Sequence, residues 1–286
     1  MNNIVKIGIQ KSGRLSEKSL GFIEECGISF SRNKTKLISR SSNFPMEFLF
    51  LRDDDIPKYV ASGVADIGIV GENVLAEKQE DVDLIMRMGF SRCRLSIGVR
   101  QSEDYTGPEF LEGKRIATSY PNLLQNFLTE KGVSADIHEI SGSVEIAPSI
   151  GLADAVCDIV SSGSTLLANG LKEVERIFNS EAVLVAQKNL APEKQAILDK
   201  LLFRIQAVLK AQHYKYILMN VPNESIKTVS DILPGMKAPT VMPLAEGGWS
   251  SVHTVVKEDD FWAIIDQLQE AGAEGILVSS IEKMIL

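Results

Sequence analysis

Residues 145–171 read EIAPSIGLADAVCDIVSSGSTLLANGL, and this stretch decides the fold. The apolar run at 155–160 is rich in β-branched residues and too short for a free-standing helix, so it predicts a buried strand. A Gly/Ser/Thr loop follows at 161–165, and a helical pattern of leucines comes after it. A strand, a Gly-containing loop and a helix in this order direct backbone N–H groups at an anion. The stretch therefore predicts an α/β fold with a phosphate site.

The side chains around this loop indicate a ligand that carries both a phosphate and a sugar. Hydroxyl groups can donate to a phosphate, whereas the nearby carboxylates can bind ribose hydroxyls or a Mg²⁺ ion that bridges to phosphate oxygens. The carboxylates are Asp154 and Asp158. The loop residues are Ser161, Ser162, Gly163, Ser164 and Thr165, followed by Leu166. The alternative without a ligand is a helix N-cap preceded by a turn-forming aspartate.

Composition and charge limit the possible functions. A chain of 286 residues suits two or three compact units. The net charge of −8 argues against a nucleic-acid binder with a broad basic surface. No arginine follows Arg204, and from residue 217 onward four Lys face ten Asp and Glu residues. Any polyphosphate site is therefore expected in the first three quarters of the chain.

The cysteines and the hydropathy indicate the compartment. Cys26, Cys93 and Cys157 are widely spaced without a C-x-x-C motif, which favours free thiols in a reducing cytosol over a disulfide framework or a zinc site. No apolar run approaches the roughly 18 residues of a membrane span, and the N-terminus does not resemble a signal peptide. We expect a cytoplasmic protein without membrane contact.

A second strand-to-helix loop lies near the N-terminus. Residues 4–9 predict a strand, and QKSGRLS follows at 10–16. Arg14 could hold a triphosphate through its planar fork and Lys11 as a point charge. The alternative is that both are solvated cations beside a turn.

One sequence unit occurs twice, 88 residues apart. Residues 63–66 (GVAD) precede an apolar strand and then Gly71, Glu72 and Asn73. Residues 151–154 (GLAD) precede the strand and loop described above. The repeat predicts two similar α/β lobes that face each other across a cleft, and loops at the carboxyl ends of parallel strands are where such sheets bind ligands.

The pattern changes after residue 213. Strands are expected at 214–221, 239–243, 249–256 and 274–279, and helices at 223–233 and 259–271. This β-α-β-β-α-β order is that of a ferredoxin-like unit. Because it contains no phosphate-binding arginine, it suits regulation or assembly better than catalysis.

Together these motifs resemble the ATP phosphoribosyltransferase family, whose members begin histidine biosynthesis. The spacing from Glu145 through Asp158 to Thr165 resembles the family signature that holds 5-phosphoribosyl 1-diphosphate. QKSGRL at 10–15, the G-x-x-x-C-R-L segment at 89–95 and RIATSYP at 115–121 resemble its nucleotide-contacting segments. The resemblance implies these nucleotide contacts: Lys11, Gly13, Arg14, Leu15, Gly71, Glu72, Asn73, Arg94, Thr118, Ser119 and Tyr120. Without a ligand, Arg94 would hold the hinge and Tyr120 would be an ordinary packing residue.

The resemblance also implies an architecture. The catalytic part is expected to be two-lobed, with the type II periplasmic-binding-protein-like fold, and an ACT-like domain follows it. Residues 1–91 and 180–213 would form the first lobe, residues 92–179 the second, and residues 214–286 the regulatory domain.

The implied activity is transfer of the phosphoribosyl group to N1 of the adenine of ATP, with release of pyrophosphate. Mg²⁺ would act mainly through the substrate phosphates, with Asp154 or Asp158 as its protein ligand. L-Histidine would inhibit by binding between regulatory domains of neighbouring subunits, with Met236, Thr240 and Gly275 as candidate contacts. Family members with this tail form homo-hexamers and need no separate regulatory subunit.

Two other functions fit the same layout. Prephenate dehydratase also combines a two-lobed α/β part with an ACT-like tail, but its Thr-Arg-Phe and Glu-Ser-Arg-Pro stretches are absent from the sequence. A cytosolic sensor could clamp a small anion between the lobes and bind an amino acid in the tail. A pyrophosphate-release assay with ATP and phosphoribosyl diphosphate separates these alternatives.

Overall fold

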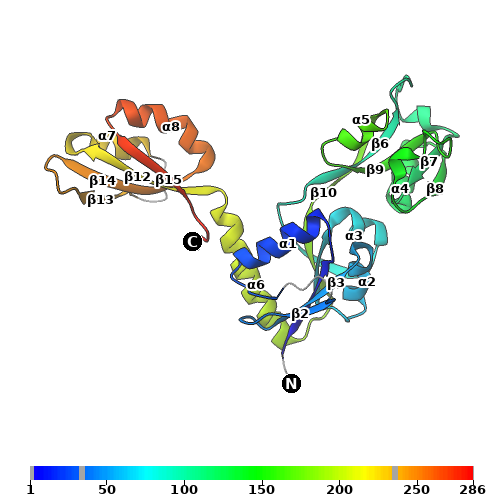
Figure 1. The fold of residues 1–286 in the computed structure, drawn as a ribbon, viewed down its shortest axis with the longest axis horizontal. Coiled ribbons are helices and arrows are strands. Elements are labelled where there is room, and N and C mark those ends of the chain that lie inside the picture. Colours follow the sequence, from blue (N-terminus) through cyan, green and yellow to red (C-terminus); the bar gives the residue numbers. More distant parts are fainter. Residues whose placement is uncertain (1–2, 32–35, 234–237, 286) are drawn as a thin grey trace. The chain divides into compact units, whose positions relative to one another are not determined.

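The computed structural model describes residues 3–31, 36–233 and 238–285. Its contacts divide the chain into two compact units, residues 1–24 with 28–198 and residues 25–27 with 199–286. The helix α6 (Pro192–Ala211) runs through the division between these units. Figure 1 shows the elements along the chain. Among the described residues, no helix is long and apolar enough to span a membrane.

The first unit contains two sheets, and the six-stranded one has the order β2-β3-β1-β4-β11-β5. Its strands are β1 (Val5–Gln10), β2 (Ile38–Arg40), β3 (Met46–Leu51), β4 (Ile67–Gly71), β5 (Val82–Arg87) and β11 (Ala182–Gln187). β1 pairs in parallel with β3 and β4, whereas β11 returns late in the chain to pair antiparallel with β4 and β5. The helices joined to this sheet are α1 (Arg14–Glu25), α2 (Ile56–Ala61) and α3 (Glu72–Lys78), with a short 3₁₀ turn at Asp53–Asp55. We call this part the first lobe.

The second sheet has five strands in the order β10-β6-β9-β7-β8. They are β6 (Cys93–Arg100), β7 (Arg115–Thr118), β8 (Asp136–Glu139), β9 (Ala155–Val160) and β10 (Leu171–Ser180). β7 is parallel to β8 and β9, and β6 is antiparallel to β9 and β10. The helices α4 (Pro121–Lys131) and α5 (Ser164–Ala168) and short 3₁₀ turns at Pro108–Leu111 and Val144–Ile146 complete this second lobe. The chain crosses between the lobes after β5 and again between β10 and β11.

Close packing explains the glycine inside β4. A Cβ atom at Gly68 would lie 2.6 Å from Cγ2 of Ile56 and 3.1 Å from Cγ2 of Val60. Both of these α2 side chains are fully buried. A glycine at this strand position therefore lets α2 approach the sheet closely.

The repeated G-x-A-D units have the same local structure. Asp66 accepts a hydrogen bond from the backbone N–H of Lys6 at 2.7 Å and donates its own N–H to the Lys6 carbonyl. Asp154 accepts the N–H of Arg115 at 3.0 Å and donates its own N–H to the Arg115 carbonyl. In each lobe this aspartate therefore fastens the start of one parallel strand to the start of its neighbour.

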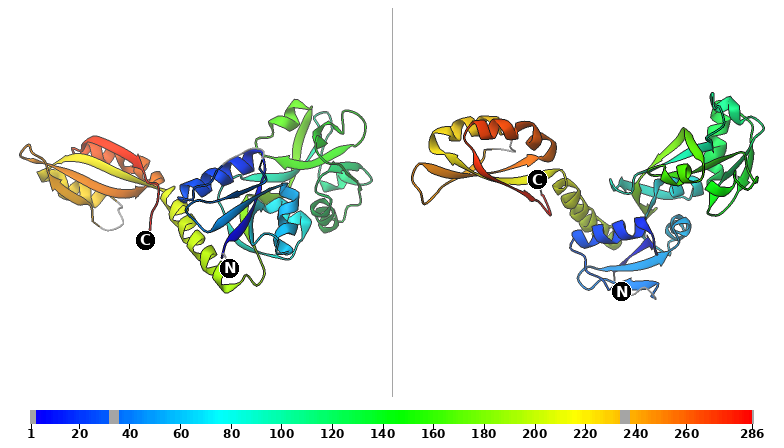
Figure 2. Two further views of the ribbon diagram at one scale, coloured as in Figure 1. Left: turned by 60° about the horizontal axis from the view of Figure 1, so that its bottom comes forward. Right: turned by 45° about the horizontal axis from the view of Figure 1, so that its top comes forward.

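The second unit holds a four-stranded antiparallel sheet in the order β13-β14-β12-β15. Its strands are β12 (Tyr214–Pro222), β13 (Thr240–Pro243), β14 (Trp249–Lys257) and β15 (Glu274–Ser280), with α7 (Ile226–Ile232) after a 3₁₀ turn at Asn223–Ser225, and α8 (Glu258–Glu270). Figure 2 shows both helices on one face of this sheet, where they cover a core that includes Met219, Val252 and Phe261. The predicted β-α-β-β-α-β order is confirmed.

Candidate active site

A cavity of about 500 Å³ lies in the first unit, where strands of both lobes end. Each strand–loop–helix segment predicted to bind a ligand contributes to its walls. The lining residues are Gln10, Arg14, Leu15, Lys18, Asp53, Gly71, Asn73, Val74, Ser91, Arg92, Cys93, Tyr120, Ile159, Ser161, Ser180 and Ala182. This is the cleft at the carboxyl ends of parallel strands that the repeat predicts.

The cleft carries an excess of positive charge. Arg14, Lys18 and Arg92 line it, and Asp53 is the acidic residue among the lining residues. Burial and the neighbouring charge of Asp54 raise the pKa of Asp53 above its ordinary value. Sequence reasoning missed Lys18 and Arg92. The position of Lys18, four residues after Arg14, could have revealed it because residues i and i+4 share a helix face.

The N-terminal loop is only partly in the cleft. Arg14 and Leu15 line it, but Lys11 and Gly13 are exposed outside the lining residues. Gly13 has a φ of +103°, a backbone conformation that favours glycine. We infer that it shapes the turn that brings Arg14 to the cleft.

The hydroxyl loop after β9 has the form that the sequence predicts. Gly163 adopts a φ of +83°, and the hydroxyls of Ser162 and Ser164 lie 2.9 Å apart. The side chains of Ser161, Ser162, Ser164 and Thr165 are exposed, so they are available to a ligand. Leu166 differs, because its side chain is buried in the core of the second lobe and can offer a ligand only its backbone.

Arg94 holds this loop through a hydrogen bond to its backbone. Its Nε and Nη2 atoms donate to the two carboxylate oxygens of Glu173, and its Nη1 atom donates to the Ser161 carbonyl at 2.9 Å. The ion pair neutralises its charge, and Arg94 is not among the residues lining the cleft. These contacts support the alternative of a structural arginine, while the implied contact with a nucleotide phosphate stays a prediction.

Asp158 is poised near the loop in a partly buried position. Burial is the main cause that raises the pKa of its carboxyl from 3.8 to about 6, and the negative charge of Glu145 adds to it. The backbone N–H of Ile159 donates to Oδ1 and acts in the opposite direction. Glu145, from the 3₁₀ turn Val144–Ile146, is thus a second carboxylate near Asp158, and its place at the head of the sequence signature could have indicated it.

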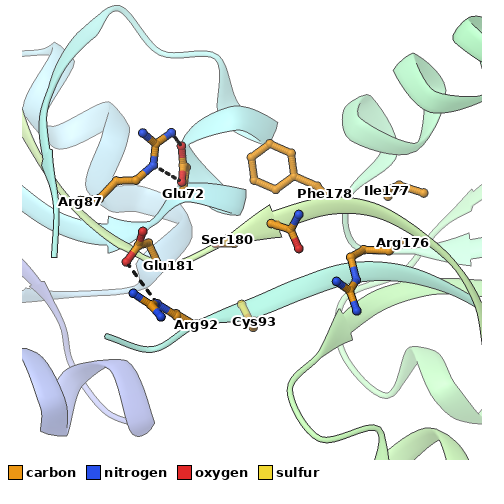
Figure 3. A pocket seen from close by; sticks show the side chains of 10 residues that line it. Glu72, Arg87, Arg92, Cys93, Arg176, Ile177, Phe178, Ser180 and Glu181 are labelled. Carbon is orange, nitrogen blue, oxygen red and sulfur yellow. Dashed lines mark hydrogen bonds and ion pairs between the residues drawn. The ribbon is translucent and has the colours of Figure 1, made fainter. Parts of the chain in front are cut away.

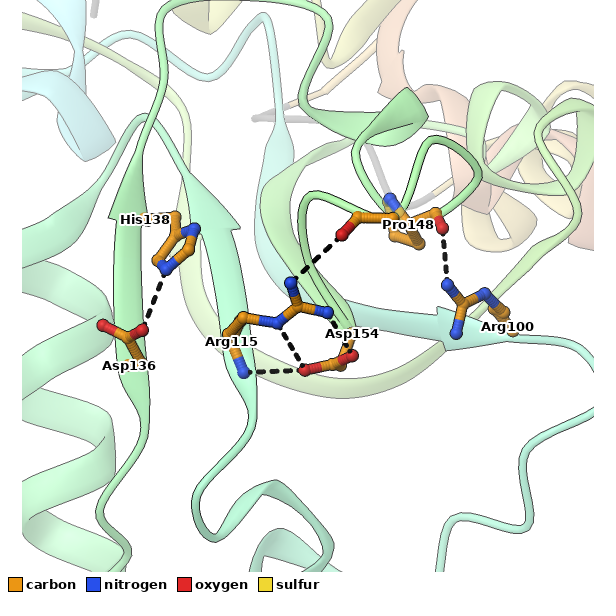
Figure 4. Close-up of polar contacts among 7 residues, drawn as sticks. Arg100, Arg115, Asp136, His138, Pro148 and Asp154 are labelled. Carbon is orange, nitrogen blue, oxygen red and sulfur yellow. Dashed lines mark hydrogen bonds and ion pairs between the residues drawn. The ribbon is translucent and has the colours of Figure 1, made fainter.

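Asp154 does not belong to this group. Figure 4 shows its carboxylate facing Arg115, which donates Nη2 to Oδ1 at 2.9 Å and Nε to Oδ2 at 3.1 Å. These bonds lower the pKa of Asp154 to about 2. Asp154 precedes the six-residue strand β9 and the loop follows it, so about 20 Å of strand separates them. Because Arg115 engages this carboxylate, Asp158 fits a sugar or metal ligand better, and the role of Asp154 stays a prediction.

Tyr120 is the one aromatic residue among the described residues that line the cleft, and its side chain contacts the first lobe. Its hydroxyl accepts a hydrogen bond from Nδ2 of Asn73 at 2.9 Å. Burial and the negative charges of Asp158 and Asp53 raise its pKa. Ser180 donates to Oδ1 of Asn73 at 2.7 Å, so the contact sits where the chain leaves the second lobe.

Three other implied contacts are not among the residues that line the cleft. Thr118 is fully buried and its Oγ1 accepts the N–H of Tyr120 at 2.9 Å. Ser119 donates its hydroxyl to the Ile140 carbonyl at 2.6 Å. Figure 3 shows Glu72 paired with Arg87 in an adjoining cavity of about 550 Å³, which shares Arg92, Cys93 and Ser180 with the cleft. Protein groups already engage these side chains, so their implied roles as nucleotide contacts stay predictions that this geometry does not favour.

Comparisons with known proteins agree with the motifs. The family model of HisG, ATP phosphoribosyltransferase, matches residues 52–207, and that of the HisG C-terminal domain matches residues 211–283. The ATP phosphoribosyltransferase of Cytophaga hutchinsonii is 62% identical over the full length of both chains. This chain belongs to the ATP phosphoribosyltransferase family. The Phocaeicola vulgatus member is 56% identical over 99% of this chain and 100% of its own.

Solved structures agree with this family and with its fold. A chain of the ATP phosphoribosyl transferase (HisG:HisZ) complex from Thermotoga maritima superposes with a TM-score of 0.61 at 29% identity, covering 71% of this chain and 99% of that chain. The substrate binding protein of an amino acid ABC transporter gives a TM-score of 0.50 at 12% identity, over 73% of this chain and 94% of its own. The two-lobed, type II periplasmic-binding-protein-like architecture with a C-terminal domain is confirmed, and the dehydratase and sensor alternatives are excluded.

The carboxylates suit a metal that arrives with its substrate. Among the described residues, no three His, Cys, Asp or Glu side chains come together in a group that could hold a metal ion. Mg²⁺ is commonly held by one or two carboxylates together with substrate phosphates. Asp158, with Glu145 near it, fits this requirement, whereas Asp154 is engaged by Arg115.

Proposed function

We propose that this chain transfers the phosphoribosyl group of 5-phosphoribosyl 1-diphosphate to N1 of the adenine of ATP and releases pyrophosphate. The observation that carries the proposal is the exposed hydroxyl loop beside Asp158, next to a cleft with Arg14, Lys18 and Arg92. One ligand with a phosphate and a diol fits the loop and the carboxylates. A second ligand with a polyphosphate and a base fits the rest of the cleft.

The loop would hold the 5-phosphate of the sugar. Its hydroxyls and the first N–H groups of α5, which have no partner inside the helix, are donors for phosphate oxygens. Each charge-assisted hydrogen bond of this kind contributes about 1.5–3 kcal/mol. Arg94 keeps the loop in place through the Ser161 carbonyl.

Asp158 and Glu145 would bind the sugar. An ionised carboxylate accepts hydrogen bonds from the two ribose hydroxyls, and the same oxygens can reach a metal. Mg²⁺, when bound with the diphosphate, would neutralise negative charge on the leaving group. Asp158 must lose its proton for this work, which its pKa of about 6 allows at neutral pH.

ATP would lie across the cleft from the sugar. Arg14, Lys18 and Arg92 face the cleft and can bind its phosphates, while Tyr120 can pack against the adenine or its ribose. Adenine N1 then forms a bond to C1 of the ribose as the bond from C1 to the pyrophosphate oxygen breaks. Holding the reactants in this geometry can lower the barrier by about 7–11 kcal/mol, and fixed donors at the leaving group lower it further. The mechanism requires no general base on the protein.

The second unit would carry feedback inhibition by L-histidine. Thr240 is exposed at the start of β13, and Gly275 is exposed in β15 with a φ of +56°. The candidate Met236 lies outside the described residues. By family resemblance we propose a cytoplasmic homo-hexamer that needs no separate regulatory subunit.

A pyrophosphate-release assay tests the proposal. The full-length chain with Mg²⁺, ATP and phosphoribosyl diphosphate is expected to release pyrophosphate, and omission of either substrate is expected to abolish the release. Added L-histidine is expected to slow it. The absence of release with both substrates present would refute the proposed reaction, whereas release that L-histidine does not change would refute only the regulatory part.

A further inference from the structure

The helix α4 of the second lobe is capped by a side chain of the first lobe. The N-terminal N–H groups of a helix have no partner inside it. In α4, Pro121 has no N–H, and Leu124 donates to the Tyr120 carbonyl. Asn122 and Leu123 donate to Oε1 and Oε2 of Glu77, each at 2.9 Å. The carboxylate of Glu77 thus completes the hydrogen bonding of this helix end.

Glu77 is built for this contact. Glu77 as a whole is only 4% exposed although it is acidic, and two N–H groups together with the positive end of the α4 dipole offset the cost of that burial. Its backbone carbonyl also accepts Nδ2 of Asn122 at 3.0 Å. Tyr120, the residue before α4, has no side-chain cap of its own.

The same helix face makes a second contact between the lobes. Asn73 lies four residues before Glu77 on α3, so the two side chains point to one side. Asn73 is 6% exposed and donates to the hydroxyl of Tyr120. Tyr120 is therefore held at its hydroxyl by Asn73 and at its backbone end by the capped helix.

We propose that Glu77 is a positioning residue for the nucleotide. By capping α4 across the lobe boundary, it fixes Tyr120 at the wall of the cleft where ATP would lie. The sugar-phosphate loop depends instead on β9 and Arg94, so loss of Glu77 affects the two substrates unequally. The assignment of Tyr120 to ATP rests on the proposed function.

The test compares the KM values of both substrates in the full-length chain. For Glu77→Ala we expect the KM for ATP to rise roughly fivefold or more, because two hydrogen bonds at the helix end are lost, while the KM for phosphoribosyl diphosphate stays within about twofold. Glu77→Gln keeps the shape and one acceptor, so it is expected to give a smaller shift of the same kind and to serve if the Ala variant fails to fold.

The matched control is Glu112→Ala. Glu112 also accepts a backbone N–H, that of Ser134 at 2.8 Å, but it lies within the second lobe alone. We expect this variant to leave both KM values unchanged. A lower Tm in the Glu77 variants with an unchanged KM for ATP, or an equal rise in both KM values, would overturn the proposal.

Calorimetric binding of ATP alone separates this proposal from the proposed reaction. If Glu77→Ala weakens ATP binding while the wild-type chain releases no pyrophosphate, the positioning role stands and the reaction is wrong. If the wild-type chain is active and both Glu77 variants bind ATP as it does, the positioning role is wrong.

Discussion

Replacing Asp158 by asparagine should stabilise the protein and inactivate it. The ordinary pKa of 3.8 is raised to about 6 in the folded chain, because burial and Glu145 disfavour the charged form. That difference corresponds to about 3 kcal/mol. Because the carboxylate keeps part of its water, we expect the asparagine variant to gain about 1–2 kcal/mol in the free energy of unfolding at pH 8.

The pH dependence has a definite sign. The unfolded chain loses this proton near pH 3.8 and the folded chain near pH 6, so the destabilisation grows as the pH rises between these values and is complete above them. At pH 8 the Tm of Asp158→Asn should exceed that of the wild type by roughly 2–8 °C, and the difference should vanish toward pH 4. The same variant should lose more than about tenfold in kcat/KM for phosphoribosyl diphosphate, because the ribose loses a charged acceptor.

Thermal unfolding followed by circular dichroism measures the stability part, and pyrophosphate release measures the activity. Glu139→Gln is the control, because Glu139 is an exposed carboxylate at the end of β8, which β7 separates from β9, and its replacement should change neither quantity. An asparagine variant less stable than the wild type at pH 8, or equally stabilised at pH 4 and pH 8, would show that the burial argument is wrong. Full activity in the variant would remove Asp158 from the sugar site.

Three further outcomes are expected. Thr165→Ala should raise the KM for phosphoribosyl diphosphate or lower kcat by more than about tenfold without changing the Tm, because an exposed phosphate donor is lost. The control Leu167→Ala, at an exposed position in the same helix, should change neither the KM nor kcat. Gly163→Ala should cost about 1–2 kcal/mol in the free energy of unfolding, seen as a lower Tm, because its φ of +83° disfavours a side chain; an unchanged Tm would contradict this strain. Asp154→Asn should lower the Tm at pH 7, because about 1 kcal/mol of stability is lost, while both KM values stay within about twofold. The ionised Asp154 contributes this stability above pH 3.8, and the contribution is lost as the pH falls toward about 2. A large rise in the KM for phosphoribosyl diphosphate would return Asp154 to the sugar site.

Local patterns predicted most of the architecture. Periodicity was sufficient to predict the strand at 155–160, the turn at Gly163 and the alternating strands and helices after residue 213. Each of these elements depends on residues that are neighbours in the sequence. The repeat of G-x-A-D predicted two lobes, and the structure shows the same hydrogen bonds at Asp66 and Asp154.

The roles of single polar side chains were harder to predict because their partners are distant in the sequence. Asp154 and Asp158 are four residues apart, yet they lie toward opposite ends of β9, and the partner of Asp154 is 39 residues away. Arg94 is neutralised by Glu173, which is 79 residues away. Only the pairing of strands across the second sheet brings such groups together.

The hydrogen bonds of Asp66 and Asp154 have a consequence for protein engineering. They join the starts of neighbouring parallel strands, whereas the residues that line the cleft lie mainly in the turns at the strand ends. A designer could therefore exchange the turns to accept a different base or sugar while leaving these two aspartates unchanged. In such a scaffold the residues that stabilise the fold are separate from the residues that select the ligand.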